Sequence, residues 1–229
     1  MARELDVVIF GATGDTGVMG CCCLFFRARA LGLRSWAPAA RSLEKLDRDV
    51  LQRLATADPG PDGLRPAPAI QADVRDEASM LAMCRQAKCV LACAGPYSDY
   101  GEAVLRACID AGTSYVDITG EVPWVEKMMR KYSAAAEEKK VDVVSFAGYD
   151  SVPPDLLTYL AAQHLKQGGK ALQRFEVFVG GAGGALPSGT LNTALKGLDA
   201  AKSSALGAFT FGMLGGAKPK NKSGEKKPK

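Results

Sequence analysis

Three glycines spaced three residues apart stand near the start of the chain, directly after an apolar run. Residues 7–10 are Val-Val-Ile-Phe, and the next seven are Gly-Ala-Thr-Gly-Asp-Thr-Gly. A strand that ends in such a loop and leads into a helix presents backbone N–H groups and a positive helix end to an anion. The spacing predicts a dinucleotide-binding loop, with an ordinary strand-to-helix turn as the alternative. Its predicted cofactor contacts are Gly11, Thr13, Gly14, Asp15, Thr16 and Gly17.

The residues that end the second predicted strand indicate which dinucleotide binds. Arg41 and Ser42 stand where an NAD site usually has an acidic residue for the ribose hydroxyls. Arg41 can pair with a 2′-phosphate in a fork, Ser42 can donate a hydrogen bond, and Lys45 follows one turn later. These residues predict NADP, and a solvent-facing arginine beside a helix cap is the alternative. Asp73, at the end of the third strand, is placed to contact the adenine amino group or to cap a turn.

Candidate catalytic side chains follow the fourth and sixth predicted strands. Tyr97 and the pair Asp150-Ser151 lie at the carboxyl ends of these strands, where the nicotinamide half of a dinucleotide binds. Gly95 and Pro96, just before Tyr97, are predicted cofactor contacts. The alternative is turn chemistry, in which Asp150 caps the following helix. No tyrosine has a lysine four residues later, which argues against a short-chain dehydrogenase mechanism, and a single histidine with scattered cysteines gives a metal site little support.

Alternating strands and helices are needed to position these residues. The pattern predicts an α/β fold with a doubly wound parallel sheet of the Rossmann type. Ser42 and Ser79 are placed to cap two of the helices. Strands are predicted over residues 5–10, 35–40, 69–74, 89–94, 114–118 and 141–146, and helices over residues 16–31 and 101–111 and from residues 43, 79, 123 and 153 onward.

Composition places the chain among folded α/β proteins. It has 229 residues, 47% of them apolar, and 25 glycines, which suffice for a sizeable core with many tight connections. Its seven cysteines lack paired spacing and are expected to be reduced core residues of a cytoplasmic protein. No apolar run reaches membrane-spanning length, and the first strand begins too early to leave room for a signal peptide.

Positive charge is concentrated at the end of the sequence. Residues 218–229 carry six lysines and one glutamate, a formal charge of +5, whereas the whole chain carries +4. The remainder is therefore nearly neutral, which argues against nucleic acid as a partner. The end segment is predicted to be a basic disordered tail with a weak attraction to anionic membrane surfaces, or a simple solvated end.

The chain is predicted to hold one complete domain and part of a second. Residues 1–169 form the NADP-binding Rossmann domain, and residues 170–217 form the truncated start of an α+β substrate domain, which precedes the tail. Residues 174–179 are its expected first strand, followed by a helix over residues 190–201. A strand without partners leaves backbone groups exposed, so closure over the nicotinamide is expected to be incomplete and turnover poor.

Several motifs occur in the order found in one enzyme family. They are Gly-Ala-Thr-Gly-Asp-Thr-Gly (11–17), Ala-Arg-Ser (40–42), Cys-Ala-Gly-Pro-Tyr (93–97), Tyr-Gly-Glu (100–102), Asp-Ile-Thr-Gly-Glu (117–121) and Tyr-Asp-Ser-Val-Pro-Pro-Asp (149–155). With them the chain resembles saccharopine dehydrogenase-like oxidoreductases, including trans-acting enoyl reductases, over about residues 5–165 and weakly through residues 188–190. The resemblance implies a nicotinamide-dependent reductase acting on a lipid-like or otherwise hydrophobic substrate.

The chain departs from the family pattern in two ways. Asp15 replaces an aromatic residue common in the family loop and brings negative charge near the expected pyrophosphate. The chain is also far shorter than members of the family, so most of the substrate domain is expected to be absent.

The leading hypothesis is an NADP(H)-dependent oxidoreductase that reduces a polarised double bond, with Tyr97, Asp150 and Ser151 as candidate catalytic residues. Two other classes stay open. The short substrate region favours a catalytically inactive cofactor-binding protein. The small-residue segment 203–217 and the lysine tail favour a peripheral protein of a lipid surface. A cytoplasmic location is expected, with a lipid or organelle surface as the second possibility.

Overall fold

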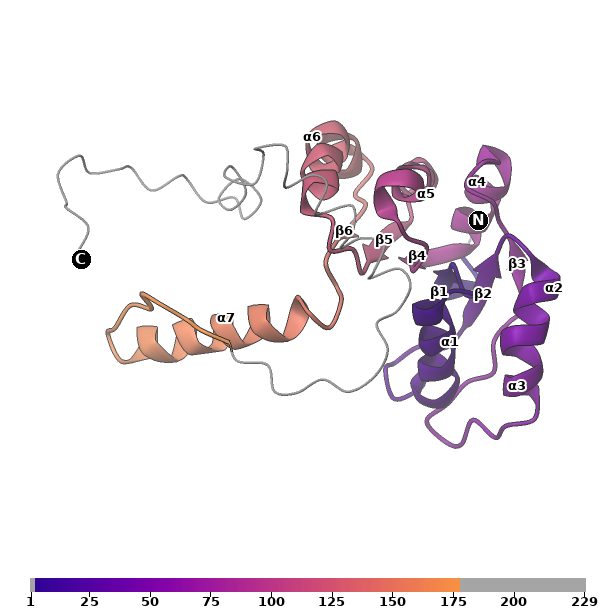
Figure 1. Cartoon of the computed structure of the whole chain (residues 1–229), viewed down its shortest axis with the longest axis horizontal. Helices are drawn as coiled ribbons and strands as arrows, with labels where there is room; N and C mark the ends of the chain where they lie inside the picture. The colour runs from indigo at the N-terminus through magenta and orange to yellow at the C-terminus, as the bar shows by residue number, and fades with distance from the viewer. Residues whose placement is uncertain (1–2, 178–229) are drawn as a thin grey trace.

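The core of the protein is a six-stranded parallel sheet (Figure 1). The computed structural model describes residues 3–177. The strands are β1 (Leu5–Phe10), β2 (Trp36–Ala40), β3 (Ile70–Gln71), β4 (Ala87–Ala92), β5 (Ser114–Asp117) and β6 (Val143–Val144). They follow the order β3-β2-β1-β4-β5-β6, and every neighbouring pair is parallel. This order confirms the predicted doubly wound α/β fold of the Rossmann type.

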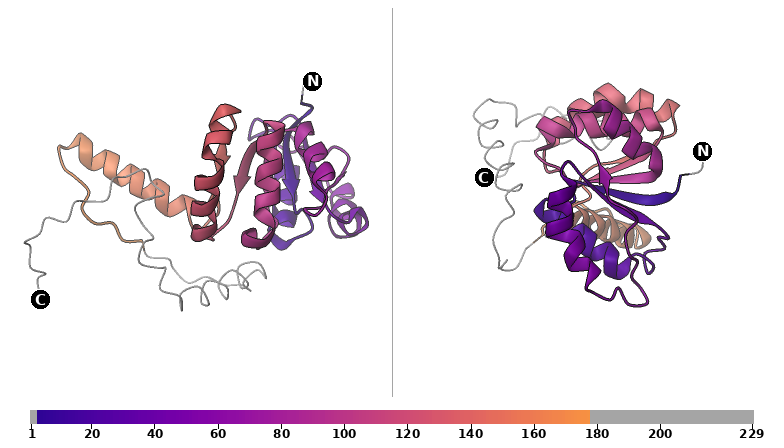
Figure 2. Two further views of the ribbon diagram at one scale, coloured as in Figure 1. Left: turned by 90° about the horizontal axis from the view of Figure 1, so that it is seen from above. Right: turned by 90° about the vertical axis from the view of Figure 1, so that its right-hand side faces the viewer.

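Helices cover both faces of the sheet, as the two views in Figure 2 show. They are α1 (Asp15–Arg27), α2 (Leu43–Leu46), the π-helical turn η1 (Asp47–Leu51), α3 (Gln52–Ala55), α4 (Glu77–Gln86), α5 (Tyr97–Ala111), α6 (Val122–Glu138) and α7 (Val152–Gln167). The helices from α1 to α3 lie on one face, and α4, α5 and α6 lie on the other. The connections therefore change sides between β1 and β4, which creates the switch point where such folds bind dinucleotides.

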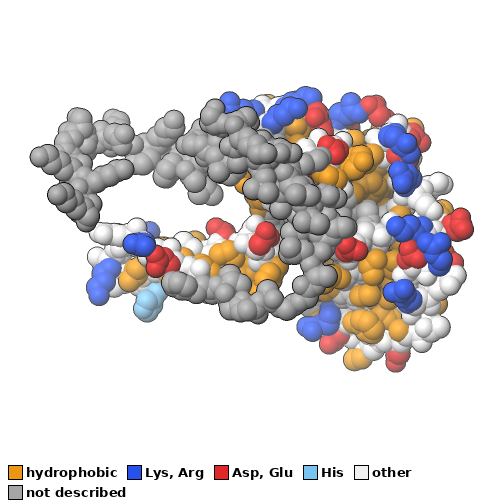
Figure 3. Space-filling view, in the orientation of Figure 1, with side chains coloured by type: hydrophobic (Ala, Val, Ile, Leu, Met, Phe, Trp, Pro, Cys, Tyr) orange, Lys and Arg blue, Asp and Glu red, His pale blue; other side chains and the backbone are white. Residues whose placement is uncertain are grey.

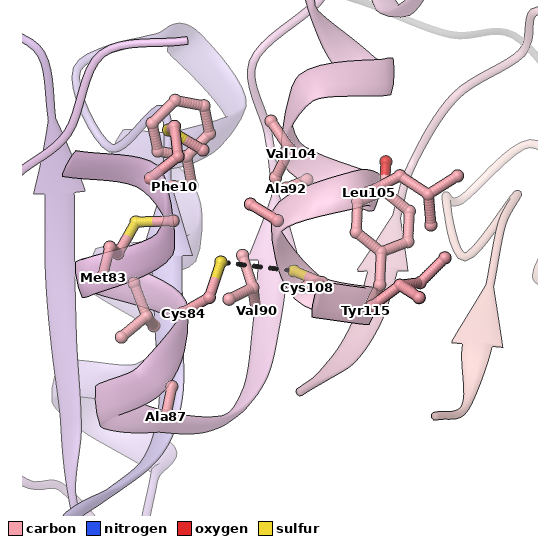
Figure 4. Packing of buried hydrophobic residues seen from close by; sticks show 14 of the residues in the cluster. Phe10, Met83, Cys84, Ala87, Val90, Ala92, Val104, Leu105, Cys108 and Tyr115 are labelled. Atoms are coloured by element: carbon pink, nitrogen blue, oxygen red, sulfur yellow. Dashed lines mark hydrogen bonds between the residues drawn. The ribbon is translucent and has the colours of Figure 1, made fainter. Parts of the chain in front are cut away.

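Two hydrophobic cores, one on each face, follow from the alternation of side chains along the strands. Val8 and Phe10 belong to the core under α4, α5 and α6, whereas Ile9 belongs to the core under α1 to α3. Figure 4 shows the first of these cores, where the Sγ atoms of Cys84 and Cys108 lie 3.6 Å apart. All seven cysteines are free thiols, and three of them are buried. The expectation that they are core residues therefore holds for part of the set.

The prediction that Ser79 caps α4 is wrong, because the helix begins about one turn earlier. Asp76 is the N-cap, and its Oδ1 accepts hydrogen bonds from the N–H groups of Ala78 and Ser79 at 3.0 and 3.3 Å. Ser79 lies inside the first turn, where its hydroxyl donates to the carbonyl oxygen of Asp76. Asp76 takes the cap because a carboxylate at this position satisfies two of the unpaired N–H groups at the helix start.

The start of α5 differs from the prediction because its cap comes from a distant loop. The helix begins at Tyr97, four residues before the predicted start. Its N-cap, Pro96, has no side-chain acceptor, and the carboxylate of Glu121 accepts hydrogen bonds from the N–H groups of Tyr97 and Ser98. Local sequence contains no sign of this contact.

Tertiary contacts also fix the end of α1. The helix ends at Arg27, one turn before the predicted end, and the N–H of Arg29 donates to the carbonyl oxygen of Asp62 at 2.9 Å. The predicted cap at Ser42 is confirmed, because its Oγ accepts a hydrogen bond from the N–H of Lys45 at 3.1 Å.

The edge strands β3 and β6 are shorter than predicted, with two residues each. Both have a pairing partner on one side, in β2 and β5 respectively. An apolar run predicts that a segment can form a strand, but not how many of its residues pair with the neighbouring strand.

α7 extends away from the sheet, and none of its residues is buried (Figures 1 and 2). Leu156, Leu157, Tyr159 and Leu160 are all more than half exposed, and Figure 3 shows apolar side chains along this helix. None of the helices in the described residues is both long and apolar enough to cross a membrane.

The region predicted as the start of a second domain is described only in part. Residues 170–177 have no regular secondary structure, so the first four residues of the predicted strand over 174–179 do not form one. The rest of that strand, the predicted helix over 190–201 and the lysine tail lie outside the described residues.

Candidate dinucleotide-binding site

The first and third glycines of the loop after β1 are required by the fold itself. Gly11 has a left-handed φ of 82°, and a Cβ there would lie 2.8 Å from the backbone nitrogen of Ala94. A Cβ on Gly17 would lie 2.1 Å from the carbonyl oxygen of Gly11. Both distances are too short for real atoms, so these two glycines let α1 and the loop after β4 approach the end of β1.

Three other glycines at this edge of the sheet meet no such restriction. A Cβ on Gly14 would meet the Gly11 carbonyl oxygen at 3.4 Å, and one on Gly95 would meet the Tyr97 ring at 3.6 Å, both ordinary contact distances; one on Gly120 would meet nothing within 4 Å. None has a positive φ, and all three are exposed. They follow β1, β4 and β5, which are neighbours in the sheet. The absence of a side chain at these positions fits a ligand whose backbone contacts run along this edge.

The start of α1 supplies donors for a phosphate. Gly14 is the N-cap, with extended φ and ψ of −83° and 162° and no side-chain cap. The N–H of Val18 makes the first hydrogen bond inside the helix, to the Gly14 carbonyl oxygen at 2.9 Å. The N–H groups of Thr16 and Gly17 precede it and lie at the positive end of the helix dipole. The residues present therefore fit the pyrophosphate of a dinucleotide.

The predicted 2′-phosphate contacts lie together at the end of β2. Arg41, Ser42 and Lys45 are all exposed. The Ser42 oxygen accepts from the Lys45 N–H, which leaves the hydroxyl proton of Ser42 available for a phosphate. Their contact with a 2′-phosphate stays a prediction.

Asp73 occupies the turn after β3 together with Arg75. Its carboxylate accepts hydrogen bonds from the Arg75 guanidinium at 2.9 and 3.2 Å and from the Arg75 N–H at 3.0 Å. These bonds, with those to the Arg75 side chain largest, lower the pKa of Asp73 to about 2. The structure thus shows the turn-capping role considered for Asp73, and the adenine contact stays a prediction.

Tyr97 lies in the first turn of α5 with its hydroxyl directed into the interior. The hydroxyl donates to the carbonyl oxygen of Ala92 at 2.8 Å and accepts a hydrogen bond from the N–H of Ile118 at 3.5 Å. Burial, more than any other cause, raises the pKa of this phenol. This geometry joins the ends of β4 and β5 and does not support the predicted catalytic role.

Asp150 and Ser151 lie in the turn between β6 and α7. Ser151 is the N-cap of α7, without a side-chain cap, so the alternative in which Asp150 caps the helix is not what the structure shows. The N–H groups of Ser151 and Val152 both donate to the Gly148 carbonyl oxygen, at 3.2 and 2.9 Å. Asp150 is exposed and Ser151 half-buried, and their catalytic role stays a prediction.

A group of polar residues at the end of β5 and in the loop that follows it was not predicted as part of the site. Asp117 is buried, and its Oδ1 accepts hydrogen bonds from the N–H groups of Thr119 and Phe146 at 3.0 and 3.2 Å. Its Oδ2 accepts from the Ser145 hydroxyl at 2.9 Å. Burial raises the pKa of Asp117, although these hydrogen bonds oppose the rise. The available signal was a polar Asp-x-Thr-x-Glu run at the carboxyl end of a strand next to β4.

Fold and site together define a Rossmann-type dinucleotide-binding domain. The family described as saccharopine dehydrogenase NADP binding domain matches residues 7–144, more than half of the chain. The chain belongs to this family, and its cofactor is NADP. Both conclusions confirm what the motifs predicted.

Three proteins with similar sequences support this family assignment. The chain is 40% identical over 204 residues to a Caenorhabditis elegans protein named lipid droplet localized protein, a match that covers 89% of this chain and 47% of the relative. It is 41% identical over 157 residues to a mouse saccharopine dehydrogenase-like oxidoreductase, which covers 67% and 36% of the two chains. A Mycobacterium tuberculosis protein named as a trans-acting enoyl reductase is 33% identical over 157 residues, covering 69% and 35%. The chain thus spans less than half the length of these relatives.

A solved structure shows the same fold. Apo saccharopine dehydrogenase (L-Glu forming) from Saccharomyces cerevisiae superposes with a TM-score of 0.55 at 16% identity, over 72% of this chain and 32% of that chain.

Gly14→Val is expected to weaken NADPH binding while the domain stays folded. The extended backbone at this position suits valine, and a Cβ meets only ordinary contacts. Overfilling the space for a pyrophosphate costs about 1–3 kcal/mol, which raises Kd by about 5- to 150-fold. Gly17→Ala is the contrasting variant, because its clash with the Gly11 carbonyl oxygen also lowers the free energy of unfolding. Fluorescence titration with NADPH and urea unfolding separate the two effects, and unchanged NADPH affinity in Gly14→Val would reduce the loop to a structural turn.

Arg41→Asp is expected to remove a preference for NADPH over NADH. A forked, charged hydrogen bond to the 2′-phosphate contributes about 1.5–3 kcal/mol, so the unmodified chain should prefer NADPH about tenfold or more. Arg130→Asp, which breaks the ion pair with Glu126 on α6, makes the same charge change elsewhere and serves as the control. Isothermal titration calorimetry with both cofactors measures the preference, and equal affinities in the unmodified chain would contradict it.

Proposed function

We propose that this chain is the cofactor-binding part of an NADP(H)-dependent oxidoreductase that reduces a polarised double bond in a hydrophobic substrate. The observation that carries the proposal is the row of exposed glycines 14, 95 and 120 along the carboxyl ends of three adjacent strands. Membership of an NADP-binding family supports the cofactor. The names of the relatives, which include an enoyl reductase and an oxidoreductase, support the reaction class.

The groups of the cofactor can be matched to residues along this edge. Thr13, Gly14, Asp15 and the N–H groups at the start of α1 would hold the pyrophosphate, with the exposed Asp15 carboxylate opposing its charge. Arg41, Ser42 and Lys45 would hold the 2′-phosphate, and Asp73 the adenine. The nicotinamide half then lies beside Gly95, Pro96 and Gly120. This direction of binding follows the sheet from β2 toward β5.

The protein residues near the nicotinamide would orient the cofactor and supply a proton. Bound NADPH supplies the hydride. Asp150 and Ser151 follow β6, next to β5, and are the candidate proton donors. In the described residues this end of the site is exposed to solvent at Gly95 and Gly120, and such exposure slows reactions that require exclusion of water.

The reaction is tested by mixing the purified chain with NADPH and an α,β-unsaturated acyl thioester or ketone. We expect slow oxidation of NADPH that depends on the substrate and is lost in Gly14→Val. Asp150→Asn and Ser151→Ala separate the two candidate proton donors, because the variant that lacks the donor should lower kcat and leave the Kd for NADPH unchanged. Tight NADPH binding without oxidation by any such substrate would favour the non-catalytic cofactor-binding alternative.

A second candidate function is association with a lipid surface. The match to the relative named for lipid droplet localization covers 89% of this chain, whereas the match to the mouse oxidoreductase covers 67% of it. α7 carries the exposed apolar residues Leu156, Leu157, Tyr159 and Leu160. We infer that these side chains contact the apolar part of a lipid surface, with the lysine tail adding attraction to anionic headgroups.

Flotation with phospholipid-coated triacylglycerol droplets tests this inference. Moving a leucine from an apolar phase into water costs about 1.5–3 kcal/mol, so Leu157→Asp with Leu160→Asp should lower the droplet-bound fraction by about tenfold or more. Met19→Asp, at an exposed apolar residue of α1, is the control and should float as the unmodified chain does. Equal flotation of all variants would contradict a role for α7.

A further inference from the structure

The carboxylate of Glu121 caps the N-terminus of α5, beside the predicted cofactor loops. One oxygen accepts a hydrogen bond from the N–H of Tyr97 at 2.7 Å, and the other accepts from the N–H of Ser98 at 2.9 Å. The first N–H groups of a helix have no acceptor within the helix, and a carboxylate there also offsets the positive end of the dipole. Glu121 therefore fixes the first turn of α5 from the loop after β5.

Glu121 is itself held by hydrogen bonds that begin at Asp117. The Asp117 Oδ1 accepts from the N–H of Thr119 at 3.0 Å, and the Thr119 Oγ1 accepts from the N–H of Glu121 at 3.0 Å. Asp117 and Thr119 are both buried, so this path is shielded from water. It gives the Glu121 backbone a defined position relative to the end of β5.

The turn that Glu121 fixes leads directly to the glycine loop. The N–H of Cys93 donates to the carbonyl oxygen of Phe10 at 2.8 Å, and Ala94 is the residue that a Cβ on Gly11 would meet. Residues 93–96 therefore lie between the glycine loop and the first turn of α5. A change in that turn displaces the exposed Gly95 along the edge where the cofactor binds.

We propose that Glu121 is a positioning residue of the NADP site, which holds residues 93–96 in the conformation that receives the nicotinamide half. It acts through the N–H groups of Tyr97 and Ser98 and does not itself contact the cofactor. The proposal rests on the direction of cofactor binding in the proposed function. It implies that loss of the Glu121 carboxylate weakens contacts to the nicotinamide half and leaves contacts to the adenosine half intact.

Two ligands distinguish these halves. NADPH spans the whole site, whereas 2′,5′-ADP carries the adenosine and the 2′-phosphate without the nicotinamide. Glu121→Ala removes two charged hydrogen bonds and is expected to raise the Kd for NADPH about tenfold, with the Kd for 2′,5′-ADP unchanged. Glu121→Gln keeps one acceptor oxygen, so it should give a smaller effect in the same direction.

Glu102→Gln is the matched control on the same helix. Glu102 accepts a hydrogen bond from the Tyr132 hydroxyl at 2.9 Å and pairs with Lys131, so it joins α5 to α6 away from residues 93–96. This variant should lower the melting temperature and leave both Kd values unchanged. It separates loss of helix contacts from loss of positioning.

Each result has one interpretation. A selective loss of NADPH affinity in Glu121→Ala, with partial rescue in Glu121→Gln, supports the proposal, and equal loss of both ligands or loss of neither overturns it. If Glu121→Ala does not fold, Glu121→Gln undergoes the same comparison with the same outcomes. Failure of the unmodified chain to bind either ligand would instead overturn the cofactor site on which the proposal rests.

Discussion

Backbone-to-backbone contact at the end of β1 is the constraint on which the rest of the site depends. α1 begins so close to β1 that a Cβ on Gly17 would lie 2.1 Å from the Gly11 carbonyl oxygen. The same loop meets the connection after β4, where a Cβ on Gly11 would lie 2.8 Å from the Ala94 nitrogen. Hydrogen atoms at these two positions allow three chain segments to converge. Because α1 starts there, its first N–H groups lie at the carboxyl edge of the sheet, where a phosphate can reach them.

A buried carboxylate organises the neighbouring half of that edge. Removing Asp117 from water is unfavourable unless hydrogen bonds compensate, and it accepts three, one of them from Thr119 and two from residues 145 and 146. Through Thr119 it orders the loop that carries Glu121, and through residues 145 and 146 it orders the turn before Asp150 and Ser151. β5 and β6 are thus coupled at this edge through the Asp117 carboxylate, and the end of β4 is joined to them through the hydrogen bonds that Glu121 accepts from Tyr97 and Ser98.

The sequence was informative where the determinant was local, and uninformative where it was not. The glycine spacing, the apolar strand before it and the Arg41-Ser42 pair predicted the sheet and NADP, and both predictions are confirmed. The phosphate contacts themselves stay a prediction. Sequence alone could not show that Tyr97 turns its hydroxyl toward Ala92, because that depends on how α5 lies against β4. The role of Glu121 was also hidden, since its partners lie 23 and 24 residues away and share no periodic pattern with it. Asp73 illustrates an intermediate case, in which the turn was foreseen but its arginine partner was not.

One end of the proposed site consists of side chains and the other consists of backbone. This difference determines how a substitution at each end affects cofactor binding. The proposed 2′-phosphate end consists of the exposed side chains of Arg41, Ser42 and Lys45. The proposed nicotinamide end consists of backbone that is held by hydrogen bonds from the buried Asp117 and Thr119 and by the cap at α5. If the cofactor binds as proposed, a substitution at the first end alters one contact to the cofactor, whereas a substitution at the second shifts several loops together. In the proposed site, cofactor preference is therefore the property that single substitutions can change at least cost in stability, and the geometry at the nicotinamide is the property they disturb most.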